Sequence, residues 1–439
     1  MPHNDILAKL KDAVHSVADN IQNYVSNPGD FSRRGKLPSD VLMEFLIGQG
    51  SRNTRNELID AFSYCKDHPS ASALVQKRSK LDPSALSDVF YQFNKSLEPS
   101  SASDYRFFAA DGSTLSFLSS LKFSDKDYFT TQGNSAKGCF SVHLTAFLDL
   151  DSHRYSDAVI QPIAQKDEYG AFSTIVDRHP LPVSAKAVFI ADRGFCSYNN
   201  MAHVIQKGQF FLFRAKDIHS KGLLHHFDFP SDDEFDVSVR LVIVRRQSQK
   251  LSLPDGYVRF VNKETSFDFI DYGADGFFLL PFRVVRFKLH SGEYEALVTN
   301  LPSDDFPPVE LKALYHRRWG IETSFRFLKY TIGLSKFHAK KALFITQEIW
   351  ARLIAYNFTS AVLNCVSIPV SNPRHVYKVS VSSAVLVCRK LILSLIVYSA
   401  LDVLELLSRE LIPIRKDRSF PRLTTAHFRR PAYFLYRPS

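Results

Sequence analysis

Two aspartates follow similar apolar runs at two distant points of the chain. Asp111 ends the run FFAAD and Asp192 ends the run VFIAD, and a glycine follows each of them within two residues. In open α/β sheets functional groups project where strands end, and carboxylate oxygens suit hard divalent cations. Both aspartates are therefore candidate site residues. Asp111-Gly112 is also the composition of a hairpin turn, and Asp192 could instead cap a helix or lie in a turn.

A third carboxylate belongs to a helix expected over residues 309–330. At about 100° per residue, its polar side chains Tyr315, Arg318, Glu322 and Lys329 share an arc of about 60° beside the apolar stripe. A carboxylate at the border of the buried stripe can reach into a site. The alternative is an ordinary pair of Arg318 with Glu322, four residues apart on a solvated face.

Changes in hydrophobic period indicate the elements that hold these residues. Residues 1–95 are expected to be helical, either as a helix-turn-helix around Gly48 to Ser51 or as a plain bundle. Strand-like runs follow over 105–215, and residues 187–215 have the pattern of a βαβ unit. Residues 217–300 show further strands between turns, and the chain after Pro307 is expected to be helical again almost to residue 412, with an interruption near 369–373.

The amino-acid composition limits the classes of protein to which this chain can belong. The 439 residues are 45% hydrophobic and 23% charged, which is typical of folded globular chains. No apolar run is long enough for a membrane span of about 20 residues, and the first residues lack the apolar segment of a signal peptide. The five scattered cysteines fit reduced thiols. A cytoplasmic protein without membrane contact is expected.

Positive charge indicates a polyanionic partner. Lysine and arginine outnumber aspartate and glutamate by 55 to 45, which gives a formal net charge of +10. The last 29 residues carry seven basic side chains against one acid, with aromatic residues between them. Basic and aromatic side chains together suit phosphates and bases, although a solvated basic tail would have the same composition.

The motifs resemble those of a known family. Tyr315, Arg318, Glu322 and Lys329 spell Tyr-(2)-Arg-(3)-Glu-(6)-Lys, which resembles the YREK signature of bacterial insertion-sequence DDE transposases. FFAADGS and FIADRGF resemble the first and second aspartate motifs of that group. The likeness spans most of the chain.

The resemblance implies an α/β fold, in which a ribonuclease-H-like catalytic domain is interrupted by an all-β insert. It also implies an N-terminal helical DNA-binding domain and a helical C-terminal region with a basic tail. The corresponding divisions of this chain are 1–98, 99–216, 217–302, 303–368 and 369–439.

Roles for six residues also follow from the resemblance. Asp111, Asp192 and Glu322 would be the catalytic and metal-binding triad, and Tyr315, Arg318 and Lys329 would contact DNA. Three carboxylates can hold two Mg²⁺ (or Mn²⁺) ions about 3.5–4 Å apart, one activating the attacking oxygen and the other stabilising the leaving oxygen.

The activity implied is cut-and-paste transposition. The expected partners are the terminal inverted repeats of the element, the target DNA and a second protomer in the DNA-paired complex, which in a bacterium is associated with the nucleoid. A hairpin intermediate is implied as well.

One feature departs from the family pattern. Members trap a flipped base with an aromatic residue of the insert, often tryptophan, but Trp319 and Trp350 lie outside the expected insert. Phe277 or Phe278 could take that place.

Two alternatives belong to other functional classes. A metal-dependent nuclease of the same fold would stop at hydrolysis, and a non-catalytic DNA-binding regulator would not cleave. Joined DNA strands would distinguish a transposase from the nuclease, and the presence of all three acidic positions argues against the regulator.

Overall fold

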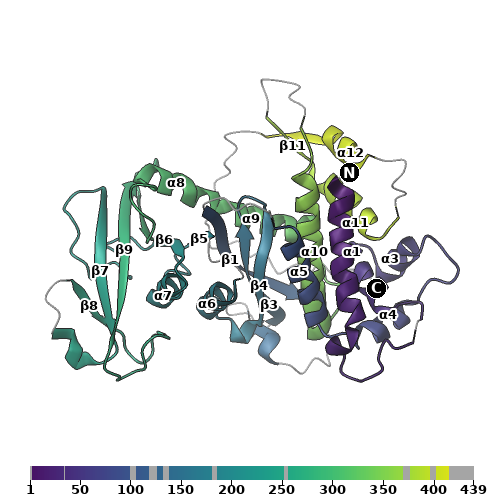
Figure 1. Cartoon of the computed structure of the whole chain (residues 1–439), viewed down its shortest axis with the longest axis horizontal. Coiled ribbons are helices and arrows are strands. Elements are labelled where there is room, and N and C mark those ends of the chain that lie inside the picture. The colour runs from purple at the N-terminus through teal and green to yellow at the C-terminus, as the bar shows by residue number, and fades with distance from the viewer. Residues whose placement is uncertain are drawn as a thin grey trace.

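The computed structural model describes residues 2–33, 35–98, 105–117, 126–131, 138–179, 185–251, 256–368, 376–395 and 402–414. The basic tail expected at the C-terminus lies outside the described residues. Figure 1 shows helices gathered at one side of the molecule and a long mixed sheet that extends away from them to the other side. No helix among the described residues is both long enough and apolar enough to cross a membrane.

The N-terminal part is helical, as expected. Its helices are α1 (Pro2–Asp19), α2 (Ser39–Gly48), α3 (Thr54–Ala61), α4 (Ala71–Arg78) and α5 (Ser84–Ser96). Asn53 and Ser70 cap α3 and α4, because each side chain accepts a hydrogen bond from an amide of the first turn. Most of α2 is buried, so it is part of the core of this region.

The central strands form the first part of the sheet. They are β1 (Tyr105–Phe117), β2 (Phe129–Thr131), β3 (Gly138–Asp149), β4 (Arg154–Pro162), β5 (Lys186–Ala191) and β6 (Phe210–Ala215). β3 pairs antiparallel with β1, β2 and β4, whereas β5 pairs parallel with β1 and with β6. The expected βαβ unit is confirmed, because α7 (Tyr198–Gln206) connects β5 to β6.

Helices cover both faces of this sheet. Ala109 and Leu115 of β1 belong to the core shared with the C-terminal helices, whereas Phe108 and Ala110 belong to the core beneath α6 (Glu168–Arg178) and α7. Successive residues of a strand point to opposite faces. Asp111 therefore lies on the same face of the sheet as Ala109, and the next residue, Gly112, lies on the face that α6 covers.

Residues 217–302 continue the same sheet. The strands are β7 (Phe235–Val244), β8 (Tyr257–Phe260), β9 (Phe277–Lys288) and β10 (Tyr294–Thr299), and β10 pairs antiparallel with β6. Within the described part of the chain the result is one ten-stranded sheet. β9 continues through Pro281, beside which β10 no longer pairs, and a strand tolerates proline at such an edge.

The C-terminal part is mainly helical. Its helices are α8 (Pro308–Arg317), α9 (Trp319–Arg326), a π-helical turn (Phe327–Thr331), α10 (Ala342–Leu363), α11 (Val381–Ile392) and α12 (Val403–Arg409). The expectation of helix alone was wrong here. The short strands β11 (Tyr377–Val379) and β12 (Leu411–Pro413) pair with each other after the interruption.

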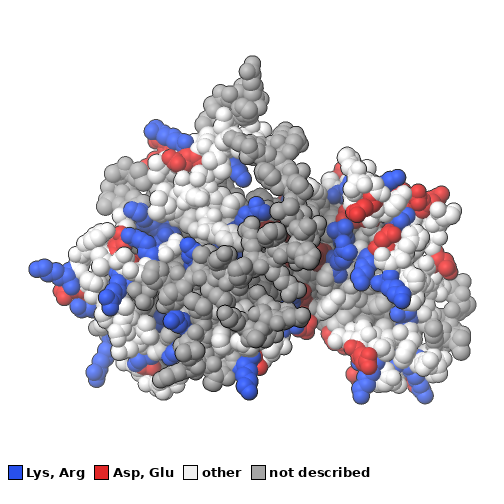
Figure 2. All heavy atoms as spheres, turned by 180° about the vertical axis from the view of Figure 1, so that it is seen from behind, with Lys and Arg blue, Asp and Glu red and all other residues white. Residues whose placement is uncertain are grey.

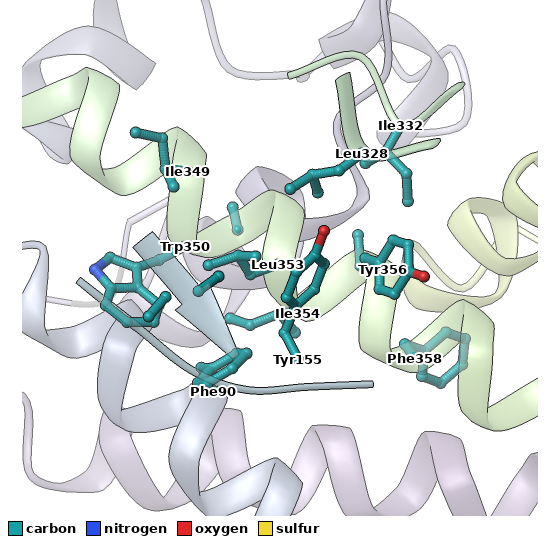
Figure 3. Packing of buried hydrophobic residues seen from close by; sticks show 14 of the residues in the cluster. Phe90, Tyr155, Leu328, Ile332, Ile349, Trp350, Leu353, Ile354, Tyr356 and Phe358 are labelled. Atoms are coloured by element: carbon teal, nitrogen blue, oxygen red, sulfur yellow. The ribbon is translucent and has the colours of Figure 1, made fainter. Parts of the chain in front are cut away.

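Helix α10 lies at the centre of the larger core. It is buried almost all round, as an apolar helix without a polar face must be. Figure 3 shows Trp350 beside Phe90 of α5, and Leu353 and Tyr356 beside Tyr155 of β4. α10 therefore connects the N-terminal helices to the sheet that carries the candidate site.

A buried ionic cluster strengthens this connection. Arg78 of α4 donates to the side chain of Gln347 and lies 3.4 Å from Glu348, both on α10. The His338 backbone amide donates to Glu348 at 2.9 Å. Burial alone would raise the pKa of Glu348, but the imidazole of His338, 3.6 Å away, together with Arg78 and Arg352, lowers it to about 2.

Replacing Glu348 with alanine should destabilise the protein by about 3–5 kcal/mol, because Arg78 is left buried without its counter-charge. Since the folded pKa of Glu348 is depressed, the stabilisation is present above the unfolded value of about 4.3 and is lost as the pH falls toward 2. Urea unfolding at pH 7 measures the change. The control is Glu405→Ala, which breaks an exposed pair with Arg409 and should cost less than about 1 kcal/mol. Equal losses in the two variants would contradict the account.

Candidate active site

Strand register brings the two candidate aspartates together. β1 and β5 are parallel neighbours with Ala110 opposite Ala191, so Asp111 and Asp192 occupy the next position on each strand. Asp111 lies inside β1, opposite Ala146 of β3, and the hairpin-turn alternative for this position is wrong. The helix-cap alternative for Asp192 is wrong as well, because the residue that caps α7 is Ser197.

Backbone amides hold both carboxylates. Gly112 N–H donates to Asp111 Oδ1 at 2.8 Å, and Gly194 N–H donates to Asp192 Oδ1 at 2.8 Å. Asp192 lies in the turn after β5, where parallel strands place functional groups. The two aspartates are therefore anchored at their own strands, independently of the helices that face them.

The helix expected over 309–330 is present from Pro308 to Thr331, but it is not a uniform α-helix. It tightens at Arg318, whose N–H bonds to the carbonyl of Tyr315, and it widens where Ile332 N–H bonds to the carbonyl of Phe327. π-helical turns of this kind are frequent at functional sites. The uniform spacing of 100° per residue therefore fails before Lys329.

Arg318 and Glu322 form the pair that their spacing allows, at 2.8 Å between Nη2 and Oε1. The guanidinium is not on a solvated face, because Arg318 is only 4% exposed. Burial would lower its pKa, but Tyr315, Glu322 and Asp111 together raise it. Arg318 is thus a permanent cation held beside the carboxylates.

Two polar atoms near this pair are buried without a hydrogen-bond partner among the described residues, namely Tyr315 Oη and Arg318 Nε. A buried polar atom without a partner costs about 1–3 kcal/mol, so native proteins rarely retain one without a reason. Tyr315 and Arg318 face each other, with the guanidinium 5.6 Å from the tyrosine ring centre. Both atoms are therefore unused hydrogen-bond donors that are closed off from solvent in this structure.

Lys329, on the π-helical turn, contacts β1. Its Nζ donates to the carbonyl of Thr114 at 3.3 Å. Burial lowers the pKa of Lys329, and the charge of Asp111 acts in the opposite direction. The cation therefore interacts with Asp111 while it is held by the same strand.

The three carboxylates share one electrostatic neighbourhood. Burial raises the pKa of Asp111 to about 6, and the charges of Asp192 and Glu322 add to this effect. The Gly112 N–H and the Arg318 cation oppose it. Like charges act on one another in this way only when they lie close together in a poorly hydrated site.

No three His, Cys, Asp or Glu side chains within the described ranges are arranged as a ready metal cage. The donor chemistry nevertheless suits a hard cation, because three carboxylates face a site where their mutual repulsion is only partly relieved by Arg318. A metal bound here would compete with Arg318 for Glu322.

A polar cavity that includes Arg193, the neighbour of Asp192, was not expected from the sequence. Arg214 of β6 pairs with Glu295 of β10 at 2.9 Å, and both act on the pKa of Tyr315. The cavity of about 510 Å³ next to this pair has a lining of mixed charge, with Arg193, Lys216 and Lys221 beside the acidic Asp217, Glu293 and Glu295. The only local signal for it in the sequence was the arginine directly after Asp192.

The fold and the site define an α/β protein with an acidic centre bordered by buried cations. The transposase DDE domain family matches residues 102–358, which is more than half of the chain and includes all six candidate residues. The chain belongs to this family.

A curated relative has a related name. The chain is 24% identical over 199 residues to "Putative transposase y4zB" of Sinorhizobium fredii (strain NBRC 101917 / NGR234). The aligned part is 43% of this chain and 47% of the relative, so the chain spans about half the length of the curated protein that it matches.

Asp111→Asn should raise the melting temperature of the DNA-free and metal-free protein at pH 7.5. The folded pKa of Asp111, about 6, lies above the unfolded value, so the stability present below about pH 3.9 is lost as the pH rises through 6. Asparagine carries no charge and keeps an oxygen for Gly112 N–H. We expect a gain of about 1–2 kcal/mol, or a few degrees, that is much smaller near pH 4.5 and disappears below about pH 3.9.

Thermal melting at both pH values measures this effect, with Asp304→Asn at an exposed loop position as the control. A melting temperature at pH 7.5 that is unchanged or lower in Asp111→Asn would show that the carboxylate is not under electrostatic strain.

Proposed function

We propose that this chain is a DNA transposase that cleaves at the ends of its element and joins the freed 3′ ends to target DNA. The observation that carries the proposal is the register of β1 and β5, which puts Asp111 and Asp192 side by side opposite the helix that bears Glu322. The family match supports the class of enzyme, and the cut-and-paste reaction is our inference from the site.

The strand order supports a ribonuclease-H-like domain. Three antiparallel strands, β4, β3 and β1, are followed by the parallel strands β5 and β6, and helices cover both faces. In this proposal residues 99–216 and 303–368 form the catalytic domain, and 217–302 form an insertion that lengthens its sheet. Residues 1–98 would bind DNA, and residues 369–439 would form the C-terminal region.

Asp111, Asp192 and Glu322 would hold two Mg²⁺ or Mn²⁺ ions. Bound ions would supply an activated oxygen nucleophile and would stabilise the leaving oxygen at the scissile phosphate. In their absence Arg318 neutralises Glu322, so this arginine keeps the acidic centre folded until a cation and DNA arrive.

Phosphates would be gripped by the cations around the acidic centre. Arg318 can donate its unpartnered Nε, and Tyr315 can donate its unpartnered hydroxyl, to the same phosphate group. Lys329, which contacts β1 at Thr114, adds a third donor. Arg193 and Arg214 of the neighbouring polar cavity could add further phosphate donors.

The outer strands carry charges of both signs. Seen from behind in Figure 2, the lobe at the right, which holds β7, β8 and β9, shows Lys and Arg side chains interspersed with Asp and Glu. This lobe also carries Phe277, which is 65% exposed, whereas Phe278 packs against Phe267 and Phe269. If an aromatic residue of the insertion traps a flipped base, Phe277 is the one of this pair that can reach it.

The partners would be the inverted repeats of the element, the target DNA and a second protomer in the DNA-paired complex. In a bacterial cytoplasm such a complex would be associated with the nucleoid. A nuclease without strand transfer and a non-catalytic regulator remain the competing functions. The half-buried, mutually repelling carboxylates favour an enzyme over a regulator, because such groups cost stability and carboxylates with raised pKa values are concentrated at functional sites.

Asp192→Asn should abolish cleavage of a duplex that carries the DNA flanking the gene, and should leave binding of that duplex nearly unchanged. Cleavage needs the charge of this carboxylate, whereas binding depends mainly on phosphate contacts. Gel analysis of products and a binding titration measure the two effects. With the wild-type protein, strands joined to a target plasmid would support the transposase, and hydrolysis without joining would favour the nuclease.

Arg318→Ala should slow cleavage and weaken end binding at low salt. Removing one protein–phosphate interaction should reduce the slope of log affinity against log salt by about one unit. The control is Arg409→Ala, which breaks an Arg-Glu pair of the same spacing on the exposed helix α12. If Arg318→Ala keeps both the slope and the cleavage rate of the wild type, Arg318 does not bind phosphate.

A further inference from the structure

Gly112 has no room for a side chain. A Cβ atom at this position would lie 2.2 Å from Glu168 Oε1 and 2.6 Å from His143 Nε2. Both distances are far below normal contacts, so Glu168 and His143 already occupy the space where a side chain of β1 would be. This contact lies on the α6 face of the sheet, opposite the face of Asp111.

Glu168 and His143 form a pair held on several sides. Glu168 lies in the first turn of α6, and its Oε1 is 2.9 Å from His143 Nε2 and 3.4 Å from Lys166 Nζ. His143 of β3 is buried, and its Nδ1 lies 3.2 Å from the hydroxyl of Thr114 on β1. The hydrogen bond with His143 is the main cause that lowers the pKa of Glu168; burial opposes it, and Lys166 adds to it.

The pair contacts β1 at the two residues that hold the site. Gly112, against which Glu168 packs, supplies the N–H that bonds Asp111. Thr114, which contacts His143, supplies the carbonyl that bonds Lys329. Any movement of β1 away from this pair would therefore displace a carboxylate and a cation of the candidate active site together.

We propose that Glu168 and His143 are positioning residues. They pack against β1 from the α6 face and thereby fix the positions of Asp111 and Lys329 on the opposite face. This inference rests on the proposed function, because it assigns the pair a part in the same site. The pair does not touch the reacting atoms in this proposal. It sets the position of the strand whose backbone orients those side chains.

Glu168→Gln tests the proposal, because glutamine keeps the shape of the side chain and removes the charge that holds His143. Mn²⁺ affinity, measured by electron paramagnetic resonance on the full chain with end DNA, should fall about 10-fold, as is usual when a residue that orients metal ligands is removed. The turnover number for cleavage should fall with it, and the KM for DNA should stay within about twofold. The matched control is Asp177→Asn, which breaks another carboxylate-histidine pair on α6, with His203. It should behave as wild type.

A second pair of variants separates positioning from packing. Gly112→Ala should lower the melting temperature, because its Cβ collides with both Glu168 and His143. Gly112→Ala combined with Glu168→Ala and His143→Ala should recover part of this loss, since both colliding side chains are gone, but should keep the weak Mn²⁺ binding. Full recovery of Mn²⁺ binding in this triple variant would overturn the proposal and leave a packing role only.

Two outcomes keep the inference separate from the proposed function. If Glu168→Gln keeps the wild-type Mn²⁺ affinity and cleavage rate, Glu168 does not position the site, and the transposase proposal is unaffected. A wild-type protein that binds Mn²⁺ through Asp111 without cleaving DNA would count against the proposed function. In that case the Mn²⁺ affinity of Glu168→Gln would still decide whether the pair positions Asp111.

Discussion

The parallel pairing of β1 with β5 is the constraint on which the candidate site depends. With Ala110 opposite Ala191, two carboxylates that are far apart in the sequence become neighbours at the point where β5 ends and β1 continues. A register shift of one residue would turn Asp111 toward α6 and leave Asp192 without its neighbour. The apolar residues around each aspartate oppose such a shift, because they fill two separate cores on the two faces of β1.

This geometry costs stability, and the neighbouring cations limit the cost. Asp111 would be protonated more readily than an exposed aspartate, since burial and two other carboxylates act on it. Arg318 of the helix offsets part of this repulsion. Lys329, which contacts β1 near its end, offsets another part. The helical segment departs from regular α-helical geometry where it carries these groups, because it tightens at Arg318 and widens at Phe327. The acidic centre and its cations are therefore one unit, and a substrate phosphate or a metal ion would have to enter between them.

Much of this arrangement could be predicted from local sequence, and the rest could not for a physical reason. FFAAD and VFIAD indicate buried strands, because strands covered on both faces are apolar throughout. Glu322 was identified by its helical phase with Arg318, but the shift at the π turn has no local pattern. The contact of Glu168 and His143 with Gly112 joins three elements that are far apart in the sequence, so no periodic sequence pattern indicates it. The same holds for the contact of Arg78 with Glu348. The pairing of β10 with β6 could not be predicted from local sequence either, because it is decided by long-range packing.

The most direct test of the central claim is the position of bound metal in a crystal of the protein with end DNA and Mn²⁺, located by anomalous scattering. The account predicts two Mn²⁺ peaks about 3.5–4 Å apart, ligated by Asp111, Asp192 and Glu322, with Arg318 moved from Glu322 to a phosphate. It would be contradicted by Mn²⁺ bound elsewhere on the protein, or by carboxylates of Asp111 and Glu322 more than about 12 Å apart in that DNA-bound form.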